Sequence, residues 1–218
     1  MNDAAARAPK IVAIMGSYHD EGMIAKLTAA VLQAASEAGA EVKTIKLHEH
    51  PIEFCTNCRQ CMQTPGPERG ECFHHDGMEA ILNELESARG IVLAAPVNMW
   101  NINALTRRFM ERCAVYGYWP WGQHAPKLRH AQASRPAVLI ASSGAPAFAG
   151  QWLSGAHSAL KFLARILGCK PIGTVWQGKI NQQQAAVAPK TLDKARQLGH
   201  YLAAQCADHA KAELTNKQ

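Results

Sequence analysis

The chain has 218 residues, of which 48% are hydrophobic and 18% charged, so it can form one large α/β domain or two small ones with a substantial core. No segment approaches the ~18 consecutive apolar residues of a membrane helix, so we expect no membrane association. The start, MNDAAARAPK, lacks the apolar run of a secretory signal, which predicts a cytoplasmic protein.

The formal net charge is +6, but the basic residues are scattered along the chain. The tightest groups, Arg107 with Arg108 and Lys127 with Arg129, are too small to form a stripe on the surface. We therefore expect no nucleic-acid partner. The positive charge favours an anionic ligand such as a nucleotide.

Short apolar runs alternate with helical repeats along the whole chain. Strands are predicted over 10–16, 41–49, 90–97, 136–144 and 170–178. Helices are predicted after Gly22, after Asp76 as the N-cap, over 102–115, through Leu153, Leu160, Leu163 and Leu167 up to Gly168, and through Leu192 to Cys206.

Five strand–helix alternations without an internal repeat predict one doubly wound parallel sheet. We expect a short N-terminal extension over 1–9, a single domain over 10–206 and a polar tail over 207–218. The aromatic, Pro- and Gly-containing stretch 114–135 is predicted to run over the surface. It could form a subunit contact or shape the acceptor side of a site.

Ligands of such sheets bind beyond the carboxyl ends of the strands, which directs attention to the loops after residues 16, 95 and 141. In the first loop, Gly16 permits a tight exit from the strand and Ser17 supplies a hydroxyl. The helix that follows offers unpaired backbone N–H groups, a ready site for an anion. Taken alone, the Gly-Ser pair is equally typical of an ordinary strand-to-helix turn.

Four of the seven cysteines, Cys55, Cys58, Cys61 and Cys72, fall within eighteen positions. Three readings remain open. Four thiolates in a curled loop suit a [4Fe–4S] cluster. They could also bind zinc, with His74 or His75 as a replacement ligand, or stay empty. The remaining three, Cys113, Cys169 and Cys206, lie in helix or strand patterns and are expected in the core.

Several of these motifs together resemble the NADPH-dependent FMN reductase-like family, and the cysteine pattern resembles its iron–sulfur flavoprotein members. The matching residues are Gly16, Ser17 and Gly22 in the first loop, the four cysteines, Asp76 with Met78, Pro96 after the third strand, and Phe109, Glu111 and Arg112. The resemblance runs from about residue 10 to 205. It implies a flavodoxin-like, five-stranded parallel sheet in the order 2-1-3-4-5.

The resemblance also implies FMN as a cofactor, with its phosphate at the first loop and its ring against the second. The third loop, with Ser142, Ser143 and Gly144, would approach the ring edge. The residues expected at FMN are Gly16, Ser17, Tyr18, Gly22, Met23, Ile24, Pro96, Val97, Asn98, Met99, Trp100, Asn101, Ser142, Ser143 and Gly144. No residue is expected to serve as a catalytic acid or base, because the flavin carries the chemistry.

The chain departs from the family pattern at three places. Met23 and Ile24 replace the hydroxyl residues that follow the second glycine, and Asp20 with Glu21 adds negative charge near the phosphate. Asn98 stands where the family often has Tyr, which leaves Trp100 either to stack on the ring or to pack in the core.

The expected function is therefore an FMN-dependent NAD(P)H oxidoreductase that reduces a small acceptor such as a quinone or free flavin. The resemblance implies a homodimer or homotetramer. The alternative is a non-catalytic electron-transfer or metal-binding protein that uses the cysteines without flavin, and Met23 and Ile24 favour it.

Overall fold

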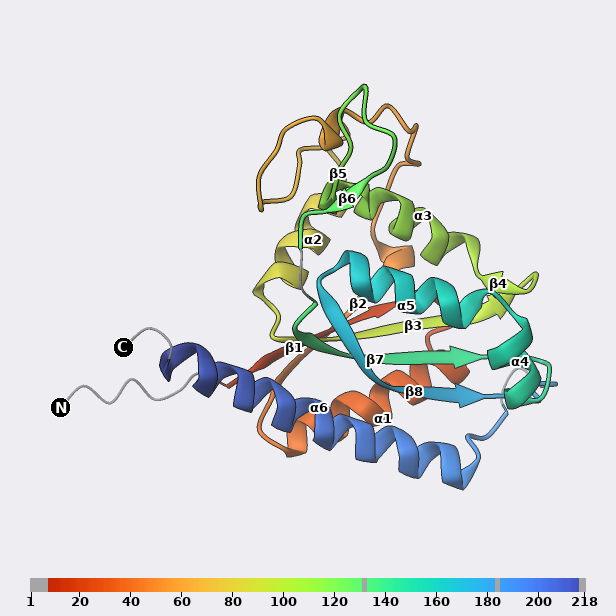
Figure 1. Cartoon of the computed structure of the whole chain (residues 1–218). Helices are drawn as coiled ribbons and strands as arrows, with labels where there is room; N and C mark the ends of the chain where they lie inside the picture. Colours follow the sequence, from red (N-terminus) through yellow and green to blue (C-terminus); the bar gives the residue numbers. More distant parts are fainter. Residues whose placement is uncertain (1–7, 131–132, 183–184, 216–218) are drawn as a thin grey trace.

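The computed structural model describes residues 8–130, 133–182 and 185–215. The expected N-terminal extension lies mostly outside these ranges. Five parallel strands form the main sheet in the order β2-β1-β3-β7-β8 (Figure 1), which is the predicted order 2-1-3-4-5. The strands are β1 (Lys10–Met15), β2 (Glu41–Lys46), β3 (Gly90–Asn98), β7 (Arg135–Ser142) and β8 (Cys169–Gln177).

Helices cover both faces of this sheet (Figure 1). One face packs against α1 (Met23–Glu37) and α6 (Pro189–Thr215), and the other against α2 (Met78–Ser87), α3 (Ala104–Arg112) and α5 (Ala156–Ile166). Both faces of β1, β3 and β7 are thus buried, which explains their continuous apolar sequences. The edge strand β2 buries only Ile45 fully and alternates instead.

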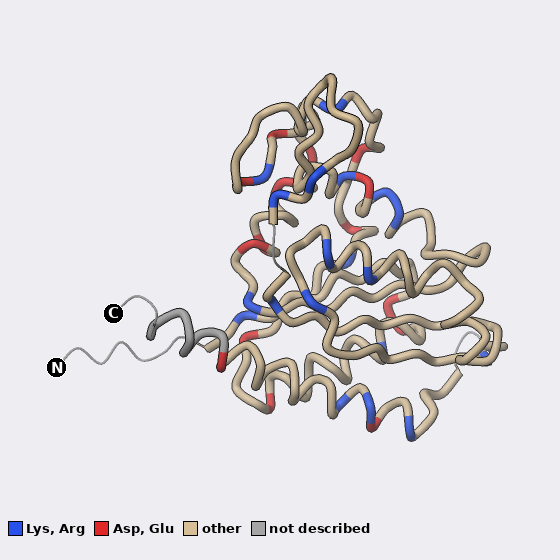
Figure 2. Tube along the Cα trace, viewed as in Figure 1, with Lys and Arg blue, Asp and Glu red and all other residues tan. Residues whose placement is uncertain are grey.

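The last helix packs closely on the first. A side chain at Gly199 would place its Cβ 2.2 Å from the carbonyl oxygen of Val31, so glycine permits α6 to approach α1. The helix continues beyond Cys206, which is buried as expected, to Thr215. Among the described residues, no helix has both the length and the apolar character needed to cross a membrane. Basic and acidic residues are interspersed along the chain (Figure 2).

The long helix predicted through Leu153 and Leu167 is wrong in one respect: it is two helices. The first, α4 (Ala147–Leu153), ends where the Ser154 hydroxyl donates to the carbonyl of Gly150, and the N–H of Gly155 then donates to the carbonyl of Trp100 at 2.8 Å. Leu153 is consequently 71% exposed, whereas Leu160 is fully buried in α5.

The helix predicted over 102–115 is shorter, because a hairpin precedes it. A two-residue strand, β4 (Asn101–Ile102), pairs antiparallel with the end of β3. Asn103 then caps α3, which passes after Arg112 into a 3-10 turn, Cys113–Tyr116.

The cysteine segment and the aromatic stretch form one lobe at an end of the molecule (Figure 1). The lobe contains a 3-10 turn, Gln60–Met62, and the paired strands β5 (Gly117–Tyr118) and β6 (Lys127–Leu128). The N–H of Trp119 donates to the carbonyl of Met62 at 2.9 Å, and Arg129 donates to three carbonyls of the cysteine segment. The aromatic stretch is therefore not a free surface excursion, since it packs on the cysteine segment.

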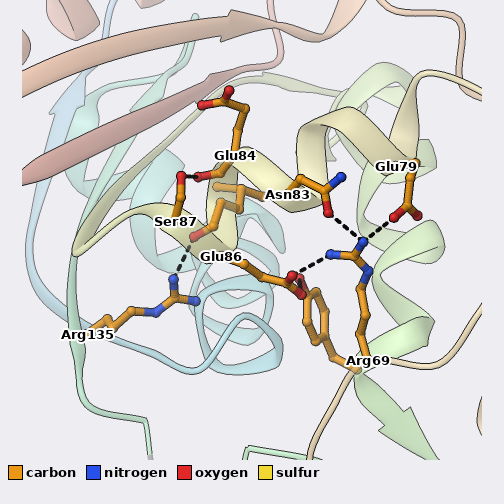
Figure 3. Close-up of polar contacts among 9 residues, drawn as sticks. Arg69, Glu79, Asn83, Glu84, Glu86, Ser87 and Arg135 are labelled. Carbon is orange, nitrogen blue, oxygen red and sulfur yellow. Dashed lines mark hydrogen bonds and ion pairs between the residues drawn. The ribbon is translucent and has the colours of Figure 1, made fainter.

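A polar network joins this lobe to α2 (Figure 3). Arg69 donates to Asn83 at 2.7 Å and pairs with Glu86 at 2.5 Å and with Glu79. The buried Tyr116 donates its hydroxyl to the same Glu86 at 2.9 Å. Because Glu79 and Glu86 are exposed, we expect each ion pair to contribute little, and the network to orient the lobe.

The different burial of Leu153 and Leu160 gives a matched test of the two-helix break. We expect Leu160→Ala to lower the free energy of unfolding by about 2–5 kcal/mol, because it leaves a cavity in the core. Leu153→Ala should change it by less than about 0.5 kcal/mol. Urea unfolding measures the free energy of unfolding of both variants. Equal losses of this free energy would contradict the break and support one continuous helix.

Candidate functional site

A cavity of about 610 Å³ opens at the carboxyl edge of the sheet, within the range of roughly 300–1,000 Å³ that is usual for cofactor sites. All three predicted loops reach it. Its walls are Ser17, Tyr18, His19, Asp20, Glu21, Gly22, Met23, Ile24, Pro96, Asn98, Asn103, Ser142, Ile180 and Gln182. The other residues expected at FMN do not line the cavity; they are Gly16, Val97, Met99, Trp100, Asn101, Ser143 and Gly144.

Gly16 holds the first loop against α3. Its N–H donates to the carbonyl of Ala94 at 2.8 Å, and its own carbonyl accepts from Asn103 Nδ2 at 2.6 Å. A Cβ at Gly16 would lie 1.9 Å from Thr106 Oγ1, so only glycine fits.

Asn103 is a site residue that sequence reasoning missed. Its side-chain oxygen accepts from the N–H of Thr106 at 3.2 Å and from the Thr106 hydroxyl at 2.6 Å, while its amide nitrogen binds the first loop. The available signal was an N-cap residue directly before a helical run. One buried side chain thus starts α3 and fixes the loop beside the cavity.

The first turn of α1 offers the backbone donors expected for an anion. The helix begins at Met23 without a side-chain cap bond, so its first N–H groups lack partners inside the helix. Ser17 is buried, and its hydroxyl oxygen accepts from the N–H of His19 at 3.1 Å.

Met23 and Ile24 point largely into the core of the α1 face. They are 7% and 2% exposed, and both also contribute to the cavity wall. Their side chains are therefore almost fully covered by the core, while their backbone N–H groups remain those of a helix start beside the cavity.

Of the two acidic residues in the first loop, Asp20 is paired with basic side chains. Asp20 Oδ1 lies 3.1 Å from Lys46 Nζ and 3.8 Å from His48 Nε2. Hydrogen bonds to Asp20 and to Glu49 raise the pKa of Lys46. His48 also contacts the loop directly, with Nδ1 3.0 Å from the carbonyl oxygen of Ser17.

The second loop is a strained aromatic turn. Met99 and Trp100 adopt left-handed φ angles of 47° and 63°, a conformation of order 1–3 kcal/mol above the usual ones and common at functional sites. Both side chains face solvent, and Trp100 is 62% exposed, so its packing in the core is excluded. The bond from Gly155 to the Trp100 carbonyl holds this turn.

In the third loop, one serine lines the cavity and the other forms hydrogen bonds within the fold. Ser142 is buried and forms part of the wall. The Ser143 hydroxyl donates to the carbonyl of Ala145 at 3.0 Å and accepts from Trp176 Nε1 at 3.0 Å, so it serves the fold. Ile180 and Gln182 follow β8 and were not indicated by any sequence pattern.

The four predicted cysteines surround a second, smaller cavity of about 30 Å³. Left-handed φ angles at Asn57 and Arg59 curl the segment between them. Burial, and then the neighbouring thiolates of Cys72, Cys55 and Cys58, raise the pKa of Cys61 to about 11. Four thiols that line one cavity form a donor set that a bound cationic centre stabilises. Cys113, Cys169 and Cys206 are buried in the core, as predicted.

A buried ion pair supports this second cavity. Arg112 is 3% exposed, and its Nη1 donates to Asp76 at 2.5 Å and to the carbonyl of Glu53 at 3.0 Å. The predicted N-cap is wrong by one residue, because Gly77 is the N-cap of α2 and has no side-chain cap bond; Asp76, directly before it, accepts from the N–H of Met78 at 3.0 Å. Although burial opposes it, the pKa of Arg112 is raised, because Asp76 accepts its hydrogen bonds and the Cys72 thiolate lies nearby.

Buried side-chain nitrogen atoms without a hydrogen-bond partner gather around the cysteines. Among the described residues, five buried side-chain nitrogen atoms lack a hydrogen-bond partner, and four lie close to the cysteine segment: Arg59 Nε, His74 Nε2, Arg108 Nε and Arg112 Nε. Arg59 and His74 line the cavity, and Arg108 stacks over Phe54. A buried donor without a partner costs about 1–3 kcal/mol, so this environment suits an anionic group with several acceptor atoms.

The thiols fit an iron–sulfur cluster better than zinc. In a tetrahedral zinc site with Zn–S bonds of about 2.3 Å, the sulfurs would lie about 3.8 Å apart. Within the described residues, the one group of three metal-ligating side chains closer than 4.8 Å is Asp20, His48 and Glu49. Lys46 already lies between its two carboxylates. A larger core with bridging sulfides suits the cysteine cavity and its donors.

The order of the strands and the cavity at their carboxyl edge define an α/β protein of the flavodoxin-like fold. Residues 9–179 match the NADPH-dependent FMN reductase family model, and the chain belongs to that family.

Similarity to individual proteins agrees with membership in this family. An iron-sulfur flavoprotein of Archaeoglobus fulgidus is 28% identical over 198 residues, which cover 89% of this chain and 79% of that protein. Further iron-sulfur flavoproteins align over about half of their length. The solved NAD(P)H:quinone oxidoreductase of Methanothermobacter marburgensis superposes with a TM-score of 0.64 at 15% identity, covering 89% of this chain and 99% of that one. An archaeal flavodoxin gives 0.53 at 12% identity, covering 91% and 99%. These two structures show the shared fold.

The double role of Asn103 gives a stability test. We expect Asn103→Ala to lower the free energy of unfolding by about 2–4 kcal/mol, since it removes the cap of α3 and leaves the Gly16 carbonyl unpaired. Asn98→Ala, in the same cavity but exposed, should change it by less than about 0.5 kcal/mol. Urea unfolding measures both variants. If Asn103→Ala lowers the free energy of unfolding as little as Asn98→Ala does, the Asn103 hydrogen bonds do not stabilise the fold.

The Asp76–Arg112 pair predicts a pH dependence. Although burial opposes it, hydrogen bonds from Arg112 and from the N–H groups of Glu53 and Met78 lower the pKa of Asp76. Its contribution is complete above the unfolded pKa of about 3.9 and is lost as the pH falls through the lower folded pKa. We expect the free energy of unfolding of Asp76→Asn to fall less steeply than that of the wild type as the pH decreases from about 7 to 3. Urea unfolding at each pH measures it. Asp193→Asn, an exposed change of the same charge, should keep the wild-type slope.

Proposed function

We propose that the protein is an FMN-dependent NAD(P)H oxidoreductase that reduces a small acceptor such as a quinone or free flavin. A [4Fe–4S] centre is proposed at Cys55, Cys58, Cys61 and Cys72. The observation that carries the proposal is the cavity of about 610 Å³, where the start of α1 meets Pro96, Asn98 and Ser142 at the carboxyl edge of the sheet. Membership in the NADPH-dependent FMN reductase family supports the same assignment.

Each loop has a separate task in this proposal. The N–H groups at the start of α1 and the Ser17 region would hold the phosphate, where the helix dipole favours an anion. Pro96, Asn98 and Trp100 would lie along the ring. Ser142 would approach its edge, where small size permits close contact. When bound, FMN supplies hydride acceptance from NAD(P)H and release of one or two electrons.

The chain's own contribution is binding and positioning. The buried side chains of Met23 and Ile24 anchor the start of α1 in the core beside the cavity. Lys46 offsets the charge of Asp20 beside the phosphate position. No side chain needs to transfer a proton, because the ring itself accepts the hydride.

Similar proteins support the choice of a small acceptor and of an iron–sulfur centre. One structural neighbour is a quinone oxidoreductase, and the aligned relatives are iron-sulfur flavoproteins. We propose a homodimer or homotetramer in the cytoplasm. The exposed apolar side chains next to the cavity, Met99, Trp100, Phe148, Trp152 and Leu153, support a subunit contact there.

The alternative, an electron carrier or metal-binding protein without flavin, rests on Met23 and Ile24. Their side chains offer no hydroxyl to a phosphate. The backbone donors of α1 weaken this alternative, because they do not depend on side-chain type.

An absorption spectrum of anaerobically purified protein, with flavin and iron measured on the same sample, separates the two functions. The proposed function predicts released FMN and a flavin band that bleaches when NADPH is added. Iron or zinc without flavin would support the alternative. A protein that binds neither FMN nor NADPH would contradict the oxidoreductase assignment.

Two exposed tryptophans give a matched test of the ring position. We expect Trp100→Ala to raise the FMN dissociation constant about 3- to 10-fold, since an aromatic contact contributes about 0.5–1.5 kcal/mol. Trp121→Ala, of similar exposure but in the cysteine lobe, should leave it unchanged. Fluorescence titration with FMN measures both constants. Equal constants for the two variants would place the ring elsewhere.

A further inference from the structure

Arg59 occupies an unusual position within the cysteine segment. It lies between Cys58 and Cys61, lines their cavity, and adopts a left-handed φ of 61°. Its guanidinium carbon lies 3.7 Å from the ring centre of Trp119 and 4.2 Å from that of Trp121. Two indoles therefore hold one planar cation, each contact being favourable by about 0.5–1 kcal/mol or more.

Hydrogen bonds also hold the Arg59 guanidinium in place against the two indole rings. Arg59 Nη2 donates to the carbonyl of Trp119 at 2.6 Å and to that of Pro120 at 3.3 Å. Arg59 Nε, by contrast, is buried and has no partner. The guanidinium is thus held in place, and its buried Nε–H has no partner in the wall of the cysteine cavity.

Gln63 connects the two segments a second time. Its Nε2 donates to the Arg59 carbonyl at 2.9 Å, and its Oε1 accepts from the N–H of Trp121 at 3.1 Å. The cysteine loop is therefore held by protein contacts that require no bound centre.

We propose that Arg59 is a positioning residue that tunes the centre bound by the cysteines: the Trp119–Trp121 stack fixes its guanidinium at the cavity wall, and its Nε–H donates to a sulfur of that centre. This inference rests on the proposed iron–sulfur centre and assigns a role to a residue that is not one of its ligands. Outer hydrogen bonds and nearby charge are established determinants of the reduction potential of such clusters.

The sign of the effect follows from charge. A cluster with four thiolates is an anion, and each added electron makes it more negative. A fixed cation with a donor aimed at its sulfurs stabilises the reduced form more than the oxidised form. Arg59 therefore raises the reduction potential and makes the centre a better acceptor of electrons from the flavin site.

The test is a redox titration of the reconstituted protein, followed by the electron paramagnetic resonance signal of the reduced cluster. We expect Arg59→Gln to make one-electron reduction at least tenfold less favourable, which lowers the potential by about 59 mV or more. Arg59→Lys keeps the charge but loses the Nε donor, so its reduction potential should lie between those of the wild type and Arg59→Gln. Arg107→Gln, an exposed change of the same charge, should match the wild type.

Each outcome decides the proposal. Equal potentials for Arg59→Gln and Arg107→Gln overturn it. If Arg59→Gln takes up little iron while its circular dichroism is unchanged, recovery of iron by Arg59→Lys supports the positioning role, and no recovery overturns the tuning role. A wild type without iron overturns the centre and this inference together. Bleaching of the flavin by NADPH in the same sample would still support the oxidoreductase function, so the failures are distinguishable.

Discussion

The buried pair of Arg112 and Asp76 is the interaction on which the arrangement of both cavities depends. It joins the end of α3 to the start of α2 and to the backbone at Glu53, two residues before the first cysteine. Separating such a pair would leave a buried charge uncompensated, at a cost of about 3–5 kcal/mol. The pair therefore determines where the cysteine segment leaves the domain.

The helix that ends at Arg112 begins at the other cavity. Asn103 caps it and binds Gly16, and nine residues at about 1.5 Å each make α3 roughly 13 Å long. The first loop and the cysteine segment are thus attached to opposite ends of one rigid element. This placement couples the two candidate sites mechanically, and it explains why a buried cap and a buried ion pair occur on the same short helix.

The sequence was sufficient to predict the strands of the sheet, because strands buried on both faces are continuous apolar runs. The loop after each strand could be placed from the end of its apolar run. The sequence was also sufficient to locate the first loop and the cysteines. It misled at Leu153, where a local break turned one helix face to solvent. It could not reveal Asn103 as a site residue or the stack of Arg59 with Trp119, because those roles depend on contacts between distant segments that no local pattern encodes.

The cysteine lobe has a consequence for assembly. Its two halves meet through bonds such as that from Arg59 to Trp119, sixty residues apart in the chain. Loop-closure entropy opposes such long-range contacts until other structure brings the segments together. We therefore expect the sheet and α3 to form before the lobe closes, because they bring its two halves together. For the iron–sulfur centre proposed at the cysteines, this order predicts that inorganic sulfur and iron are loaded late, on a scaffold that has already folded.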